Sequence, residues 1–587
     1  MEKRISLVSI LLGLAVLVLV LRLGFWQILK SGEFSRLARA QYLTGEKIIA
    51  ERGLILSSDG MPLAASQISW QVWADPGKIE KAPLELSSTL GPLIFNDKFP
   101  DATVPAQLES GQLLEEERIK KLLEQKEKRW VSISDKVSDK ALKTIESLKL
   151  AGFGWERFNS RFYPEASMAA HLLGFLGKDE TGEKGYFGLE GFYDITLSGK
   201  SGFVRQEEDL RGNPIPFGFF SNIPANNGLD LVTYIDRGAQ FIIEKHIKEG
   251  VEKYGAKSGS IILMKPTGEI LGMASTPSYD PAKYNQAQQE VLKNPAVADS
   301  FEPGSVFKIL VMASALDADV VKPDTKCDIC TGPIQIGKYD IRTWDDKYHP
   351  LSTMQDVIVH SDNTGMVFVA NKLGKEKMWD YLNKFGIGQL TNVDLEEEAS
   401  PALRDRGAWG DIDLATSSFG QGVAITPIQL ARATAAIANK GILPVPRVVE
   451  KIQGGTFEQK IPMQDQGRVI SEEAAWEITQ MMVAAVKYGE SKWAAPKGFN
   501  VAGKTGTAQI PIAGHYDPNK TMASFVGFAP ADPPAGGPKF VMLVTLREPS
   551  SSPWASETAA PLWFQIAKDL FPYFGIQPTS VASGIQN

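Results

Sequence analysis

This 587-residue sequence contains little cysteine or histidine. Its only cysteines are Cys327 and Cys330, and no second Cys-x-x-Cys pair could complete a zinc site. The five histidines show no spacing typical of metal ligands. A local disulfide in an oxidising compartment, or two free structural thiols, is therefore favoured over redox catalysis. We expect no metal and no other cofactor.

The sequence also lacks a dense tract of lysine and arginine, and its formal net charge is −7. Nothing in this charge pattern favours a nucleic-acid partner. A single long apolar run, Ile5 to Leu21, extends through Arg22 to Leu29 and is long enough to cross a hydrocarbon core of about 30 Å. We expect a transmembrane anchor at 5–29 rather than a cleaved signal peptide, because the cleavage-like Ala38-Arg39-Ala40 lies far beyond the run.

Three short strings are present once each and carry chemistry: Ser305-Val306-Phe307-Lys308, Ser361-Asp362-Asn363 and Lys504-Thr505-Gly506-Thr507. A lone Ser-x-x-Lys would mean little, since about two are expected by chance in a chain of this length. The apolar spacing after Pro303-Gly304 predicts that Ser305 opens a buried helix, with Lys308 on the same face of its first turn. The three strings together predict a serine nucleophile with a lysine base.

The remaining motif residues supply the other needs of acyl transfer. Lysine accepts a proton only if burial or a second cation lowers its pKa, and Lys504 is that cation. Ser361 can relay the proton, and the amide of Asn363 can hold a peptide backbone. Residues 501–508 suit an edge strand on which Thr505, Gly506 and Thr507 bind a terminal carboxylate. The backbone N–H groups of Ser305 and Thr507 are the candidate oxyanion hole.

These motifs resemble those of the penicillin-binding proteins and class A β-lactamases. Further segments resemble the class B penicillin-binding proteins, and those from Ser418 to Leu430 resemble its division-type branch. The segments are Arg52-Gly53-Leu54-Ile55, Arg161-Phe162-Tyr163-Pro164, Gly188-Leu189-Glu190, Thr233-Tyr234-Ile235-Asp236, Ser418-Phe419-Gly420-Gln421-Gly422 and Ser524-Phe525-Val526-Gly527. The resemblance implies a mixed α+β chain in which a serine β-lactamase-like transpeptidase domain follows an elongated pedestal and one transmembrane helix.

The resemblance and the turn signals together predict the domain boundaries. We expect a cytoplasmic tail at 1–4, the anchor at 5–29, a pedestal of the dimerisation type at 30–226, the catalytic domain at 227–576 and a flexible tail at 577–587. Residues 115–150 are charged and have helical periodicity. In the catalytic domain, a hairpin at 265–268 should join two strands, and helices should cover both faces of a mixed sheet.

We therefore expect a D,D-transpeptidase that cross-links peptidoglycan stem peptides through an acyl-Ser305 intermediate, with septal wall synthesis as its setting and β-lactams as inhibitors. The alternatives are an elongation-type transpeptidase, a D,D-carboxypeptidase, a β-lactamase that uses Glu396, Glu397 or Glu398, and a penicillin-binding sensor without turnover. The resemblance implies a polytopic SEDS-type glycosyltransferase and divisome membrane proteins as partners. It also places the catalytic domain outside the bacterial cell membrane, with the N-terminus in the cytoplasm.

Overall fold

The computed structural model describes residues 2–99, 104–180, 182–207, 213, 215–216, 220–512, 515–531 and 537–579. The chain divides into two compact units. Unit 1 is built from residues 1–52, 68–159 and 198–228, and unit 2 from residues 53–67, 160–197 and 229–587. Both units contain helices and strands, which agrees with the predicted mixed α+β class.

Unit 1 begins with helix α1 (Glu2–Gly24), a π-helical turn (Phe25–Leu29) and helix α2 (Ser31–Tyr42). The apolar side chains of α1 are exposed along its whole length. Residues 3–29 form the one helix, among the described residues, that is long and apolar enough to cross a membrane. An aliphatic surface of this size is unfavourable in water, so the helix needs a lipid or protein surface around it.

The rest of unit 1 contains two sheets and a helical cluster. Strands β1 (Leu43–Ile48), β8 (Gly202–Glu207) and β9 (Phe220–Ile223) form an antiparallel sheet. Helices α3 (Pro83–Lys98), α4 (Pro105–Leu123) and α5 (Asp139–Ser147) share an apolar core with β3 (Pro62–Ala74) and β4 (Val131–Val137). Strand β5 (Phe153–Phe162) pairs with β3.

The prediction of a continuous helical segment at 115–150 was wrong in its middle. Strand β4 interrupts the segment there and pairs with β3, with Ala74 opposite Val131 and Trp70 opposite Val137. The β-branched residues Val131 and Ile133 alternate with serine and are buried, which is the period-2 pattern of a half-buried strand. The charged residues on both sides of this short run concealed it.

The centre of unit 2 is a five-stranded sheet in the order β12-β11-β21-β20-β19. Its strands are β11 (Ser258–Met264), β12 (Ile270–Thr276), β19 (Ala502–Ile512), β20 (His515–Ala529) and β21 (Phe540–Arg547). The predicted hairpin joins β11 to β12 at 265–268. The prediction of a mixed sheet was wrong, because all four pairings are antiparallel. The connections within the hairpins β11–β12 and β19–β20 are too short for the crossover that parallel pairing requires.

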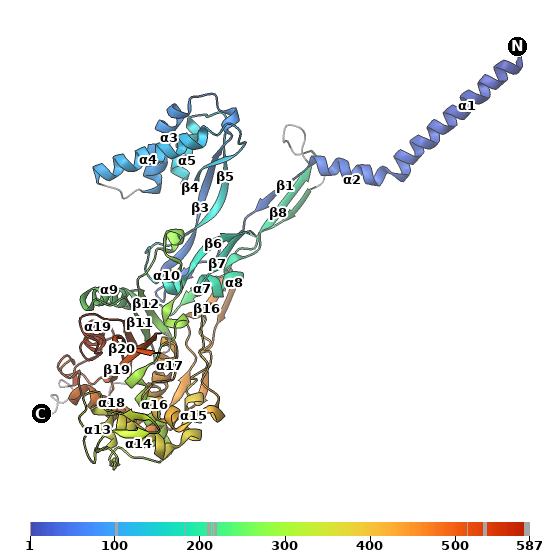
Figure 1. The fold of residues 1–587 in the computed structure, drawn as a ribbon. Coiled ribbons are helices and arrows are strands. Elements are labelled where there is room, and N and C mark those ends of the chain that lie inside the picture. The colour runs from blue at the N-terminus through green and yellow to red at the C-terminus, as the bar shows by residue number, and fades with distance from the viewer. Residues whose placement is uncertain are drawn as a thin grey trace. The chain divides into compact units, whose positions relative to one another are not determined.

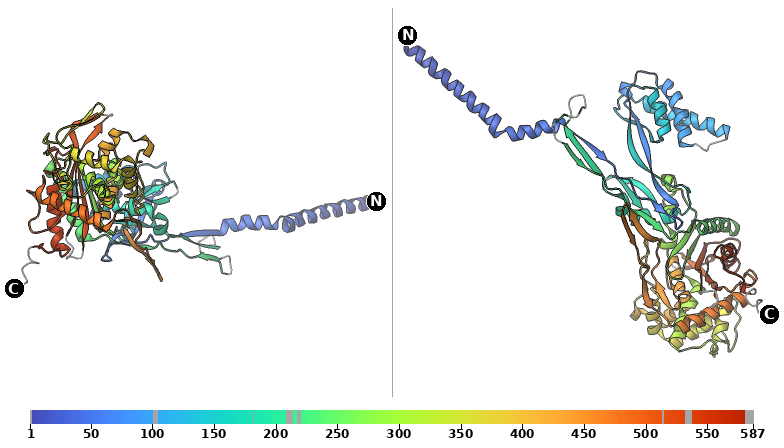
Figure 2. Two further views of the ribbon diagram at one scale, coloured as in Figure 1. Left: turned by 90° about the horizontal axis from the view of Figure 1, so that it is seen from below. Right: turned by 180° about the vertical axis from the view of Figure 1, so that it is seen from behind.

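Helices cover both faces of this sheet, as predicted. On one face, α9 (Arg237–Tyr254) and α19 (Ala559–Tyr573) pack against alternate residues such as Ile261 and Leu263 (Figure 1). On the other, α12 (Lys308–Asp317), α14 (Asn363–Leu373), α17 (Pro427–Ala438) and α18 (Glu472–Tyr488) share a core with Ile262 and Met264. Figure 2 shows the same layers from two further sides. Burial on both faces explains the nearly continuous apolar sequences of β11 and β21.

The remaining elements are short. They are β2 (Ile55–Leu56), α6 (Ala170–Leu173), β6 (Phe175–Asp179), β7 (Gly182–Tyr186), α7 (Gly188–Phe192), α8 (Asp194–Ser198), β10 (Asp230–Thr233), α10 (Gln289–Leu292), α11 (Pro295–Ala298), β13 (Ile334–Ile336), β14 (Tyr339–Ile341), α13 (Met354–Val359), α15 (Lys375–Lys384), α16 (Asp411–Ser417), β15 (Ile442–Pro444), β16 (Val449–Gly454), β17 (Phe457–Lys460) and β18 (Asp465–Arg468). A buried ion pair joins Arg161 of β5 to Glu190 of α7 at 2.6 Å. Most of the predicted tail, from residue 580 on, lies outside the described residues.

Candidate active site

The candidate nucleophile lies on a tight turn that leads directly into a buried helix. Residues Gly304–Phe307 form a 3₁₀ turn, and α12 continues from Lys308. Val306 and Phe307 are fully buried, which fixes the turn, while Ser305 between Gly304 and Val306 is partly exposed. Gly304 has a φ of 59°, a conformation that favours glycine. The predicted buried helix is present, and its first turn is 3₁₀ rather than α-helical.

The second motif lies where two helices meet. Helix α13 begins with a capping box between Thr353 and Asp356, and α14 begins at Asn363 with Asp362 as its N-cap. Ser361 between them has a φ of 56°, a left-handed conformation that is uncommon for a residue with a side chain. This bend directs both the carbonyl oxygen and the hydroxyl of Ser361 toward Lys308.

The two cysteines lie beside the start of α13 and form a disulfide. The Cys327 N–H donates to the Ser352 carbonyl at 2.9 Å. Lys326 forms an isolated antiparallel β-bridge with Thr353, the N-cap of α13. The disulfide therefore closes a loop that holds the beginning of the helix whose end carries Ser361.

The third motif lies on β19, which is an edge strand of the sheet, as predicted. A Cβ atom on Gly506 would lie 2.8 Å from the Pro303 carbonyl oxygen and 2.8 Å from a methyl carbon of Val306. Glycine is therefore required where β19 passes the 3₁₀ turn at Gly304–Phe307, called the nucleophile turn below. Lys504 and Thr505 are buried, and the Thr507 hydroxyl accepts a hydrogen bond from the Ala555 N–H at 3.0 Å.

The two lysines meet at the hydroxyl of Ser361. Lys504 Nζ lies 3.0 Å from Ser361 Oγ and 3.2 Å from both the carbonyl and hydroxyl oxygens of Thr505. Lys308 Nζ donates to the Ser361 carbonyl and, at 2.8 Å, to Asn363 Oδ1, and lies 3.3 Å from Ser361 Oγ. An ammonium group has three N–H donors and a neutral amine has two. Each of the two lysines thus has three oxygen partners, and the Ser361 hydroxyl is shared between them.

Burial and charge, rather than the number of hydrogen-bond partners, distinguish the two lysines. Burial, and secondly the cation of Lys504, lower the pKa of Lys308 well below its ordinary value. Burial lowers the pKa of Lys504 to about 8. Lys308 is therefore the lysine that gives up its proton more readily, because the Lys504 cation adds to the effect of burial.

Two features of the predicted site differ from the geometry. Among the hydrogen bonds of the described residues, none joins Ser305 to Lys308, although the two residues lie one turn apart. The Asn363 Nδ2 group, expected to hold a substrate backbone, donates to the Arg342 carbonyl at 2.8 Å. This contact uses one of the two N–H groups of the amide and leaves the other for a substrate.

The motifs border one cleft of about 280 Å³. Ser305, Ser361, Asn363, Thr505 and Thr507 all line it. Two further walls are aromatic: Phe419, and the pair Trp344 and Trp554, whose rings meet edge-on at 5.4 Å. Tyr516 on β20 donates its hydroxyl to the carboxylate of Glu302.

Comparison with known proteins agrees with this geometry. Residues 259–571 match the profile of the penicillin binding protein transpeptidase domain, and residues 47–233 match the penicillin-binding protein dimerisation domain. The chain belongs to the class B penicillin-binding proteins. It is 31% identical to stage V sporulation protein D of Bacillus subtilis, over 98% of this chain and 86% of that protein. It is 28% identical to peptidoglycan D,D-transpeptidase FtsI of Escherichia coli, over 98% of this chain and 92% of that protein.

A solved structure shows the same fold. Penicillin binding protein 3 of Mycobacterium tuberculosis, in complex with aztreonam, has a TM-score of 0.68 and 24% identity, over 91% of this chain and 98% of that one.

The prediction from sequence did not identify one residue that lies beside the site of this penicillin-binding protein. Glu490, which follows α18, lines the catalytic cleft, and its charge raises the pKa of both Lys308 and Lys504 against the effect of burial. Gly489 brings the end of α18 close to α13, since a Cβ there would lie 2.8 Å from the Val359 carbonyl oxygen. Glu490 belongs to none of the three motifs, and no local pattern separates it from surface glutamates.

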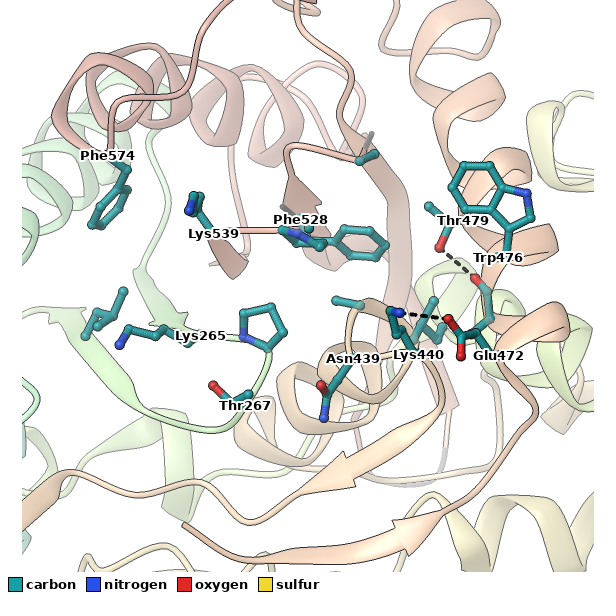
Figure 3. A pocket seen from close by; sticks show the side chains of 18 of the residues that line it. Lys265, Thr267, Asn439, Lys440, Glu472, Trp476, Thr479, Phe528, Lys539 and Phe574 are labelled. Atoms are coloured by element: carbon teal, nitrogen blue, oxygen red, sulfur yellow. Dashed lines mark hydrogen bonds and ion pairs between the residues drawn. The ribbon is translucent and has the colours of Figure 1, made fainter. Parts of the chain in front are cut away.

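A further cavity of unit 2 lies away from this cleft. It has a volume of about 1220 Å³, and none of the predicted site residues lines it. Figure 3 shows its border of lysines and aromatic residues, where Lys440 pairs with Glu472 at 2.8 Å. No group of three or more histidine, cysteine, aspartate or glutamate side chains could hold a metal ion within the part of the chain that the structure describes.

Proposed function

We propose that this penicillin-binding protein is a monofunctional D,D-transpeptidase whose nucleophile is Ser305. Its hydroxyl attacks the carbonyl carbon of the penultimate D-alanine of a stem peptide, and the terminal D-alanine leaves as an amine. An amine from a second stem then displaces Ser305 and forms the cross-link. The observation that carries the proposal is the meeting of two buried lysines at Ser361 Oγ, in the cleft that Ser305 lines.

Lys308 is the base in this proposal. The Ser305 proton passes to Lys308 directly or through Ser361 Oγ, and the same pair returns it to the departing amine. The hydroxyl route is supported by distance, because Ser361 Oγ lies 3.3 Å from Lys308 Nζ. The neutral state of Lys308 is supported by its burial and by the neighbouring cation of Lys504.

Lys504, Thr505 and Thr507 bind the terminal carboxylate of the donor. A cation with two hydroxyls on the edge strand of the sheet suits this anion, and β19 can pair with the substrate backbone. The N–H groups of Ser305 and Thr507 stabilise the oxyanion, a role in which one donor contributes roughly 3 to 4 kcal/mol.

The proposal is favoured over a β-lactamase. Rapid deacylation would need a glutamate that activates water beside the acyl bond. Glu396 accepts from the Phe187 N–H, Glu397 from those of Gly188 and Asn294, and Glu398 from those of Thr391 and Asn392. All three carboxylates are thus engaged with backbone, and none of the three residues lines the cleft.

The cellular setting belongs to the same proposal. The apolar segment at 5–29 anchors the protein in the bacterial cell membrane with residues 1–4 in the cytoplasm and the catalytic domain outside. The motifs between Ser418 and Leu430 support a septal role, with a SEDS-type glycosyltransferase and divisome membrane proteins as partners. We retain the proposed domain limits at 30–226 and 227–576 as predictions.

Labelling with a fluorescent penicillin tests the proposal. The full-length protein in detergent should form a long-lived adduct, Ser305→Ala should form none, and the parent should release D-alanine from a stem pentapeptide. An adduct that is lost within seconds would favour a hydrolase. A stable adduct without turnover of stem peptide would favour a sensor, and a folded parent without an adduct would refute Ser305 as the nucleophile.

A further inference from the structure

The apolar helical segment at residues 3–29, which contains the predicted anchor, is longer than the hydrocarbon core of a membrane. Its 27 residues are exposed, and at 1.5 Å per residue they span about 40 Å. The hydrocarbon core of a bilayer is only about 30 Å thick. In a membrane, the end of this segment therefore reaches the level of the lipid headgroups, and helix α2 begins at that level.

The side chains at the end of the segment are of the kinds found at a membrane interface. Phe25 and Trp26 are each 43% exposed, and their rings meet edge-on at 5.4 Å. Exposed tryptophan is typical of the headgroup level. Arg22 and Lys30 lie on either side of this pair in the sequence, and long basic side chains can extend to the headgroups. This composition places residues 22–30 at the interface.

The helical path changes at the same level. Phe25–Leu29 form a π-helical turn, which the Lys30 N–H closes by donating to the Phe25 carbonyl at 2.9 Å. Helix α2 then begins at Ser31, whose hydroxyl donates to the Ile28 carbonyl at 3.0 Å. A π-helical turn interrupts the regular ladder of hydrogen bonds and is a common cause of a kink. Helix α2 is therefore a separate element and not a regular continuation of α1.

Helix α2 is amphipathic. Phe34 and Leu37 are three residues apart and so share one face, where they are 47% and 52% exposed. Arg36 lies two residues from Phe34, which places it on the opposite side of the helix. An apolar face opposite a basic one is typical of a helix that lies at a boundary between water and an apolar phase.

The apolar face of α2 continues the apolar surface of the segment before it. The ring of Phe34 lies 5.3 Å from the ring of Trp26, so the two surfaces meet directly. Ile28 and Leu29, which precede α2, are 76% and 75% exposed. One apolar surface thus extends from the end of the segment to the first two turns of α2, and the phase that covers its first part also reaches its second.

We propose that α2 lies along the membrane surface as an interfacial helix, with Phe34 and Leu37 at the acyl-chain boundary and Arg36 among the headgroups and water. This assignment rests on the proposed membrane anchor. Lipid is the occupant because the apolar face of α2 continues the surface that the anchor presents to lipid. Two large apolar side chains would bind a membrane weakly by themselves, but the anchor already holds α2 there, so binding costs little further translational freedom.

An interfacial α2 holds the first sheet of unit 1 at the membrane surface. Strand β1 begins at Leu43, immediately after Tyr42, the last residue of α2. No linker separates the two elements, so a helix that lies in the plane of the membrane also fixes how far β1 begins from it. A flexible segment of the same length would leave this distance variable.

Fluorescence quenching by lipid tests the assignment. Both cysteines of the chain form the disulfide, so an introduced cysteine is the single free thiol. Ile28→Cys, Arg36→Cys, Leu37→Cys and Glu249→Cys are made in the full-length protein, labelled with a fluorophore and reconstituted without other proteins into vesicles of phosphatidylcholine and phosphatidylglycerol. Quenching by lipids with a nitroxide near the top of the acyl chain is measured at each position. Glu249, an exposed residue of α9, is the control in water.

We expect quenching at position 37 to be within about twofold of that at position 28, and at least about threefold stronger than at positions 36 and 249. Equal quenching at positions 37 and 249 would overturn the interfacial helix, and equal quenching at positions 36 and 37 would overturn the assignment of its faces. Absence of lipid quenching at position 28 would instead refute the membrane anchor itself. All four labels replace exposed side chains, and a parent-like thermal midpoint confirms that each variant is folded.

Discussion

Removal of the Lys504 charge should raise the pKa of Lys308 by about two units. Both nitrogens lie close to the same hydroxyl oxygen, at 3.0 and 3.3 Å, so they are at most about 6.3 Å apart. Two like charges at that distance repel by about 2.6 kcal/mol at an effective dielectric constant of 20, which equals about two pKa units. Since the proposed base Lys308 can accept a proton only when neutral, the rate of acylation of Ser305 should rise with pH through this pKa.

The assay is the second-order rate of acylation by a fluorescent penicillin between pH 5 and 10. In Lys504→Gln the midpoint of the rising limb should move about two units toward higher pH, whereas Lys504→Arg, which retains the charge, should keep the parent midpoint. In the parent, the rate should also fall above about pH 8, where Lys504 loses its proton. This falling limb should be absent from Lys504→Gln. A rising limb that stays in place in Lys504→Gln would refute the argument that Lys504 controls the base.

Three further outcomes are expected. Gly506→Ala should reduce penicillin acylation at least tenfold, because its methyl group would push β19 away from the nucleophile turn; a parent-like rate would contradict the close approach. Glu190→Ala should lower the free energy of unfolding by roughly 3 to 5 kcal/mol in denaturant titration, because it leaves Arg161 as a buried unpaired charge. Replacing Cys327 and Cys330 with alanine should cost only about 2 kcal/mol in the same titration, since the closed loop is short, and a much larger loss would indicate a wider role for the bridge.

Much of unit 2 follows from local sequence signals. The apolar spacing after Ser305 gave a buried helix, and Lys265-Pro266-Thr267-Gly268 gave a hairpin. The three motifs were identified as one site because each is unique in the chain and their chemistry is complementary. In the structure Ser305, Ser361 and Asn363 line one cleft, and Lys308 and Lys504 both contact the Ser361 hydroxyl.

Other features depend on contacts between distant segments and could not be read from local patterns. Strand β4 was concealed because its alternating residues are few and lie between charged helices. The contribution of Glu490 depends on how α18 ends against α13, which only the close packing at Gly489 reveals. The engagement of Asn363 by the Arg342 carbonyl likewise joins a motif to a loop with no signature of its own.

The left-handed bend at Ser361 has a consequence for how the enzyme tolerates mutation. One of the oxygens that bind Lys308 is a main-chain carbonyl, which no substitution at this position removes. A change of the Ser361 side chain would interrupt the relay yet preserve that carbonyl contact, provided that the new residue tolerates the bend. A substitution of Ser361 would therefore impair the proposed proton relay and leave the carbonyl contact to Lys308 in place. Part of the proposed site is thus determined by the path of the main chain and not by the identity of a side chain.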